Sequence, residues 1–133
     1  MVDDKWFLKV LPNVFTQVEY MLAKKHPKLN CTTKSESTRT VFPTLYLHEL
    51  QPVEEGQDLV NDGVTAVLST MEIQVWSNIN ETECKEILAD AILEMKRFGF
   101  SVTMFPSVQT DNKIAWGAVR FRRMIGAGDA IAQ

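Results

Sequence analysis

The chain has 133 residues, and its formal net charge at pH 7 is −3. This length fits a single domain, residues 1–133, whose core is large enough to need neither metal ions nor disulfides. Proteins that bind nucleic acids in general carry a basic surplus, so the acidic balance argues against that class while leaving room for a local basic patch. No apolar run approaches the length of a membrane span, so we expect no membrane as a partner.

The first residues, MVDD, are acidic and no apolar stretch follows them, so the sequence predicts no export signal. The two cysteines, Cys31 and Cys84, lie in unrelated contexts. We expect both to be free thiols, buried or half-buried, because the cytoplasm is reducing. Because the sequence predicts no export signal, the protein is expected to be made and to act in a cytoplasm.

Residues 3–26 have the three- and four-residue periodicity of an amphipathic helix. The apolar residues on its predicted face are Leu8, Leu11, Phe15, Val18 and Leu22. Pro12 predicts a short helix before Leu11 and a longer one from Pro12, because proline clashes with the preceding turn. Pro27 predicts the helix end, and the polar residues 28–40 predict a weak edge strand followed by a loop.

Two stretches alternate as half-buried strands do. In residues 42–50, Leu45 and Leu47 face one side, and Pro43 near the start indicates an edge position. The side chains that face the other way are Thr44, Tyr46 and His48. In residues 64–77, one face carries Val67, Met71, Ile73 and Val75, and the other carries Glu72, Gln74 and Trp76. This alternation is typical of a sheet with helices on one face and the other face available.

Turn-forming and acidic residues fill the stretch between these strands, residues 51–63. Its carboxylates are Glu54, Glu55, Asp58 and Asp62. They lack the alternating spacing of a calcium-binding EF-hand loop, so we interpret the stretch as a long, flexible, solvated hairpin loop.

Asn80 and Glu83 have the spacing of a capping box, which predicts the start of a second helix. The predicted buried face of this helix carries Cys84, Ile87, Leu88, Ala91, Ile92, Met95 and Phe98. Gly99 predicts its end. Residues 100–108 and 113–124 predict a hairpin across residues 110–112, and residues 126–133 are expected to be a flexible C-terminal arm with one apolar hook, Ile131.

These elements predict an α+β fold with a mainly antiparallel sheet of four to five strands and two helices packed on one face. They contain no nucleophile motif, phosphate-binding loop or metal cluster, so the sequence predicts neither an enzyme nor a cofactor. Neither histidine, His26 or His48, has ligands at metal-binding spacing, and both are expected at a surface or interface.

The basic residues gather near the C-terminal strand, as Lys96, Arg97, Arg120, Arg122 and Arg123. They could contact DNA phosphates, but we favour cross-strand pairing with carboxylates such as Glu72, or contact between subunits. Trp76 and Trp116 form either a second small core or an interface anchor, and their charged neighbours favour the anchor. The predicted subunit or partner interface therefore comprises Glu72, Gln74, Trp76, Trp116, Arg120 and Arg122.

Four sequences carry a family resemblance: FPTLYLHE at residues 42–49, EIQVWS at residues 72–77, the helix 84–95 with FGF at residues 98–100, and AVRFRR at residues 118–123. In this order the chain, from about residue 11 to residue 125, resembles the tail terminator, or tail completion, proteins of long-tailed bacteriophages, closest to those of siphophages of Gram-positive hosts. The family has no active-site motif whose residues could be assigned to positions of this chain.

The resemblance implies a structural subunit of the virion that assembles in the host cytoplasm as a homohexameric ring on the tail tube. The ring stops tube polymerisation, contacts the tail tube protein, and offers the surface that joins the head-completion or connector protein. DNA passes through its lumen without sequence-specific binding. The acidic residues of the 51–63 loop are then expected to face the lumen, where they would repel DNA, or a neighbouring ring.

Two other interpretations remain open on the sequence. The chain could be a head-completion or stopper protein of the head–tail connector, although connector adaptors are mostly helical. It could instead be a small α+β nucleic-acid-binding module, because aromatic residues on strands can stack on bases.

Overall fold

The computed structural model describes residues 5–36, 38–55 and 66–133. It begins with a 3₁₀ helix, η1 (Trp6–Lys9), which continues directly into α1 (Val10–Lys25). A short helical segment before a longer helix is therefore confirmed, although the α-helix starts two residues before Pro12. The tight turn of η1 shifts the phase of the buried face, because a 3₁₀ helix has three residues per turn. Leu8 is consequently 62% exposed and does not belong to the core.

The buried stripe of α1 runs at four-residue steps through Val10, Val14, Val18 and Leu22. Leu11 and Phe15, which the periodicity placed in the core, are only partly buried at its margin. The predicted face is thus correct for Val18 and Leu22 and is rotated at the start of the helix.

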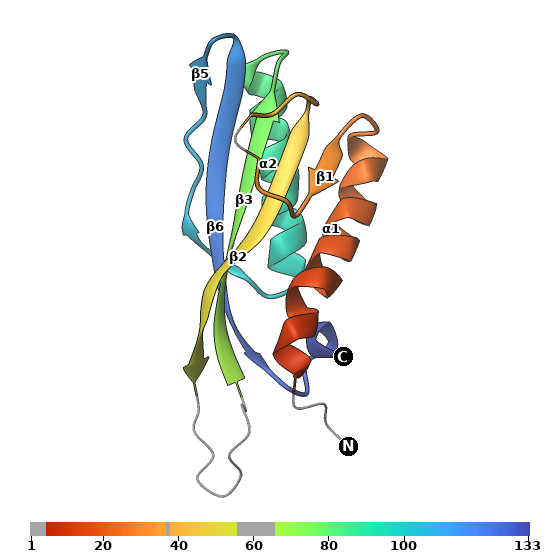
Figure 1. Cartoon of the computed structure of the whole chain (residues 1–133), viewed down its shortest axis with the longest axis vertical. Coiled ribbons are helices and arrows are strands. Elements are labelled where there is room, and N and C mark those ends of the chain that lie inside the picture. The colour runs from red at the N-terminus through yellow and green to blue at the C-terminus, as the bar shows by residue number, and fades with distance from the viewer. Residues whose placement is uncertain (1–4, 37, 56–65) are drawn as a thin grey trace, which may run out of the picture.

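In the described residues the sheet contains six strands in the order β1-β2-β3-β6-β4, with β5 also pairing with β6 (Figure 1). Their bounds are β1 (Asn30–Thr32), β2 (Thr44–Glu55), β3 (Ala66–Ser77), β4 (Ser101–Met104), β5 (Gln109–Asp111) and β6 (Ile114–Gly126). Strand β1 is parallel to β2, and the other pairs are antiparallel. The predicted α+β fold with a mainly antiparallel sheet is confirmed. The strand count exceeds the expected four to five because residues 109–111, expected near the hairpin turn, form β5, a second short strand that pairs with β6 besides β4.

Strand β2 differs from the sequence expectation at both ends. It lies between β1 and β3, so the edge position that Pro43 indicated is wrong, and Pro43 precedes the strand. At the other end the strand continues through residues 51–55, which were expected in a loop, since Val53 pairs with Leu68. The pairing tolerates Pro52 because the register shifts between Leu50 and Val53.

Helix α2 (Glu81–Arg97) begins as its capping pattern predicts, with Asn80 Oδ1 accepting the backbone N–H of Glu83 at 2.8 Å. The Glu83 carboxylate accepts the hydroxyl of Ser77 at 2.7 Å, which ties the start of the helix to the end of β3. Gly99, with φ of +84°, ends the helix in the left-handed conformation that glycine tolerates best.

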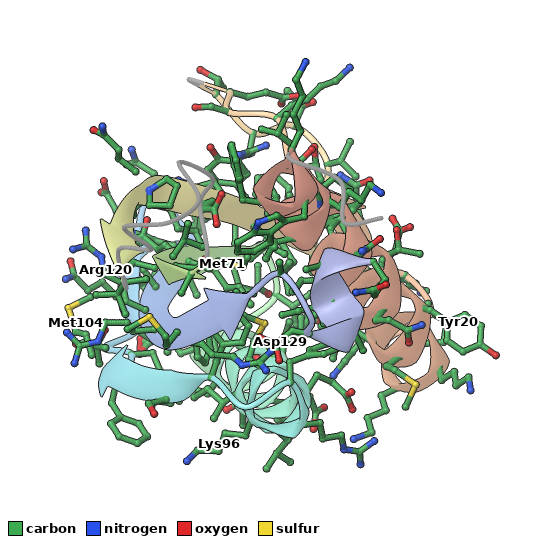
Figure 2. All side chains as sticks on the ribbon, turned by 90° about the horizontal axis from the view of Figure 1, so that it is seen from below. Tyr20, Met71, Lys96, Met104, Arg120 and Asp129 are labelled. Carbon is green, nitrogen blue, oxygen red and sulfur yellow. The ribbon has the colours of Figure 1, made fainter. Side chains whose placement is uncertain are left out.

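Both helices pack on the same face of the sheet, and the core lies between the two layers (Figure 1). The strands contribute Leu45, Leu47, Ile73 and Phe121, which are fully buried. Figure 2 shows Met71 inside the molecule, whereas Arg120 and Met104 lie on the side away from Tyr20 of α1. Within the described parts of the chain, no helix is long and apolar enough to cross a membrane.

The C-terminal segment, expected as a flexible arm, forms a short 3₁₀ helix, η2 (Ala130–Ala132), that packs against the rest of the domain. Ile131 is buried as the predicted hook, and its carbonyl accepts a hydrogen bond from the side chain of Asn13 at 2.9 Å. Asp129 adds an ion pair to Arg123 at 3.2 Å and accepts the backbone N–H of Gly126 at 2.7 Å. These bonds hold the segment against the domain, so the prediction of a flexible arm is wrong.

The close packing of β6 against α2 can be tested at Gly117. A Cβ atom there would lie 2.9 Å from Leu88 Cδ1 and 3.0 Å from Val108 Cγ2. We expect Gly117→Ala to lower the free energy of unfolding by about 1–3 kcal/mol through overpacking, as measured by urea denaturation. Gly128→Ala is the control, because nothing lies within 4 Å of its Cβ position, and it should change stability by less than about 0.5 kcal/mol. Equal stability of both variants would contradict the packing.

Candidate interface on the outer sheet face

The face of β2, β3 and β6 that points away from the helices, here called the outer face, is set by strand register. Side chains of three successive strands lie in rows across it. These rows are Thr44–Trp76–Trp116, Tyr46–Gln74–Ala118, His48–Glu72–Arg120 and Leu50–Thr70–Arg122. All six residues of the predicted interface therefore lie on one face, as the alternation indicated.

Glu72 is the centre of a hydrogen-bonded cluster on this face. Arg120 Nε donates to Glu72 Oε2 at 2.8 Å, and Gln74 Nε2 donates to Oε1 at 2.6 Å. His48 Nε2 lies 2.9 Å from Oε1, and the His48 ring stacks on Tyr46 with centroids 4.7 Å apart. The cluster fixes the rotamers of side chains from three strands at once, and therefore makes this part of the face rigid.

The neighbours of Glu72 also decide its charge state. Burial acts to raise the pKa of its carboxyl group, but hydrogen bonds from Arg120, His48 and Gln74 and the charge of Arg120 outweigh it, so the pKa lies below the ordinary value. Glu72 is only 5% exposed. It was expected on an exposed polar face, whereas it is an internal anion that positions the exposed groups around it.

Arg39 fastens the segment between β1 and β2 onto the outer face. Its guanidinium lies 4.7 Å from the centroid of the Trp76 ring and 5.1 Å from that of Tyr46. It also donates to the carbonyl of Lys34 at 3.3 Å and pairs with Glu36 at 3.8 Å. The sequence offered no signal for this role, because Arg39 lies in a polar stretch without periodicity.

A hollow of about 310 Å³ lies at the same end of the face. Trp76 and Trp116, which are direct partners in the β3–β6 register, both line it. The remaining lining residues are Glu36, Thr38, Arg39, Phe42, Asp111, Asn112 and Ile114. Partly exposed tryptophans in a hollow with a polar rim are typical of protein interface anchors.

The basic residues near the C-terminal strand are mostly paired. Arg120 pairs with Glu72, Arg123 with Asp129, and Arg97 with Glu94 at 3.5 Å. Pairing of Arg120 with Glu72 is what the cross-strand interpretation predicted. Arg122 is exposed and forms no ion pair with the residues that the structure describes. The outer face is therefore less basic than its sequence indicates.

The acidic residues predicted to face a lumen or a neighbouring ring do not form part of this site as described. Glu54 and Glu55 lie on β2, but their side chains are outside the described part of the structure. Asp58 and Asp62 lie outside the described residues altogether. Their role stays a prediction.

The two cysteines and His26 have surroundings that are typical of structural residues. Burial raises the pKa of Cys31 to about 12 and that of Cys84 to about 11, with further contributions from Glu19 and Glu83 respectively, so both free thiols stay protonated near neutral pH. His26 bonds to Asp90 at 2.7 Å and joins the two helices. Among the described residues, no three His, Cys, Asp or Glu side chains gather in a way that could hold a metal ion.

Neither a scan against protein-family models nor a search of curated proteins finds a match to this chain.

The electrostatic role of Glu72 can be tested with Glu72→Gln. Because its pKa is lower in the folded chain than the ordinary 4.5, the ionised carboxylate stabilises the fold above that pH, and this contribution is lost as pH falls through the folded-state pKa. We expect Glu72→Gln to cost about 1–3 kcal/mol at pH 7, since an amide faces three donors. The deficit relative to wild type should shrink below about pH 4.5, as measured by urea unfolding across pH.

Glu86→Gln is the matched control, because Glu86 is an exposed carboxylate on α2. It should have almost the stability of wild type at every pH. A deficit of Glu72→Gln that stays constant from pH 7 to pH 3 would contradict the assigned role of the charge.

Proposed function

We propose that this chain is a structural subunit of a ring that caps the tail tube of a long-tailed bacteriophage, stops its polymerisation and provides the head-joining surface. The observation that carries the proposal is the outer face, which displays two tryptophans and a rigid charged cluster on the side away from the helices. The sequence resemblance to tail terminator proteins supplies the assembly in which such a face would act.

The physical character of this face supports a protein contact. Tryptophan, tyrosine and arginine dominate the energetics of protein interfaces, and all three occur here. The side chains around Glu72 are already held in one conformation by hydrogen bonds, so binding would cost little side-chain entropy. A rigid face is also suited to closing a ring, because the angle between subunits must repeat without accumulating error.

A ring further requires head-to-tail contacts between two different surfaces of each subunit. The outer face is one candidate surface. The second is the outward side of α2, where Leu93 is 54% exposed. These surfaces belong to opposite layers of the domain, which is the arrangement that a head-to-tail contact needs. The proposed role is structural and involves no catalysis.

The alternatives have less support. Contact with nucleic acid would need several basic groups that are free to bind phosphate, yet three of the five basic residues near the C-terminal strand, Arg97, Arg120 and Arg123, each pair with a carboxylate. A stopper protein of the head–tail connector would use the same kind of rigid face, so the position of the ring in the particle separates it from a terminator.

Electron microscopy of the purified protein tests the proposal directly. We expect six-fold rings, or a cap at one end of headless tails or of polymerised tube protein that halts further growth. Absence of both rings and caps would exclude the terminator role, whereas binding at the head connector alone would favour the stopper.

The contribution of the outer face is tested in the same assay with Trp116→Ala, which removes an anchor ring from a partly exposed position. We expect this variant to fold and to require at least about tenfold more protein to cap the tube. Tyr20→Ala removes an exposed aromatic ring from α1 and should assemble as wild type does.

A further inference from the structure

The hollow beside Trp76 and Trp116 is lined by aromatic rings and by two carboxylates. Its volume, about 310 Å³, is at the small end of the range of ligand pockets, which suits one side chain better than a cofactor. Glu36 and Asp111 line it, and Arg39 is the one cation among the described residues that do, so this part of the lining carries one carboxylate more than cations. This charge favours a cationic occupant.

The chain already places one guanidinium in this environment. Arg39 stacks on Trp76 and is paired with Glu36. Trp116 lies directly opposite Trp76 in the β3–β6 register, but no cation from the described residues stacks on its ring. The hollow thus holds a second indole, that of Trp116, and a second carboxylate, that of Asp111, and no cation from the described residues stacks on this indole.

Asp111 is held at the rim by a tight turn between β5 and β6. Asn112 and Lys113 have φ of 50° and 67°, as in the two-residue turns that match the twist of a hairpin. Asp111 pairs with Ile114 across this turn. Asp111 and Trp116 line the same hollow, and the turn gives this carboxylate a defined backbone position.

We propose that the hollow binds an arginine side chain presented by a different protein, with its guanidinium on Trp116 and beside Asp111. Arginine fits better than lysine, because its planar group stacks on an indole and bonds a carboxylate at the same time. A lysine ammonium offers only a point charge.

The arginines of the chain itself argue against a second copy as the source. Arg39, Arg97, Arg120 and Arg123 each pair with a carboxylate within the chain. Arg122 is exposed but lies on the same face as the hollow, so in a head-to-tail contact it cannot reach the hollow of a neighbour. The exclusion of a second copy rests on the head-to-tail contact of the proposed function, whereas the binding of an arginine does not.

NMR titration of the ¹⁵N-labelled full chain tests the proposal, with N-acetyl-arginine methylamide as the probe. We expect saturable shifts of the Trp116 indole N–H at millimolar probe, while the buried Trp6 indole serves as the internal reference. N-acetyl-citrulline methylamide, which is nearly isosteric and neutral, should bind at least about fivefold more weakly, and the lysine analogue should fall between the two.

Variants assign the effect to the hollow. Asp111→Asn should weaken arginine binding about threefold, and Glu86→Gln, which removes an equal charge from α2, should leave it unchanged. Equal binding of arginine and citrulline, no saturation, or equal weakening by both variants would overturn the proposal. Self-association that competes with the probe and is lost in Asp111→Asn would assign the hollow to a second copy and would also overturn it.

Discussion

The pairing of β3 with β6 is the constraint on which both surfaces of the sheet depend. Its register runs without a shift from Ala66–Gly126 to Ser77–Ala115. On one side it places Met71 beside Phe121 in the core, and on the other it places Glu72 beside Arg120. Because successive side chains alternate between faces, a slip of one residue would bury the ion pair and expose the core. Core packing and the outer face therefore enforce the same register.

The outer face resembles a small polar core more than an ordinary solvated surface. Glu72 is nearly as buried as the apolar residues behind it, yet its oxygens accept hydrogen bonds from side chains on β2, β3 and β6. A buried carboxylate is tolerated only when its charge is compensated in this way. The compensation has an entropic consequence, because the side chains that bond to Glu72 have already lost rotamer freedom that binding to any partner would otherwise remove.

Local patterns in the sequence predicted the α+β layers, the α2 cap at Asn80 and the facing of β3, since each of these is decided by residues within a few positions of one another. The extension of β2 through residue 55 was not predictable, because Pro52 and its acidic neighbours are typical of turns, and only pairing of Val53 with Leu68 overrides them. The stacking of Arg39 on Trp76 was missed for a related reason: the contact joins segments far apart in sequence and follows no period.

Charge pairing also explains how a chain with a net charge of −3 accommodates the basic residues of β6. Arg120 and Arg123 lie on opposite faces of β6, and each is neutralised by a carboxylate on its own side, Glu72 on the outer face and Asp129 at the C-terminal turn. A phosphate would have to displace these carboxylates, which already accept hydrogen bonds within the chain, so it would gain less than it would from free arginines. The arginines therefore act mainly on the fold: one organises the outer face and the other holds the C-terminal segment against the domain.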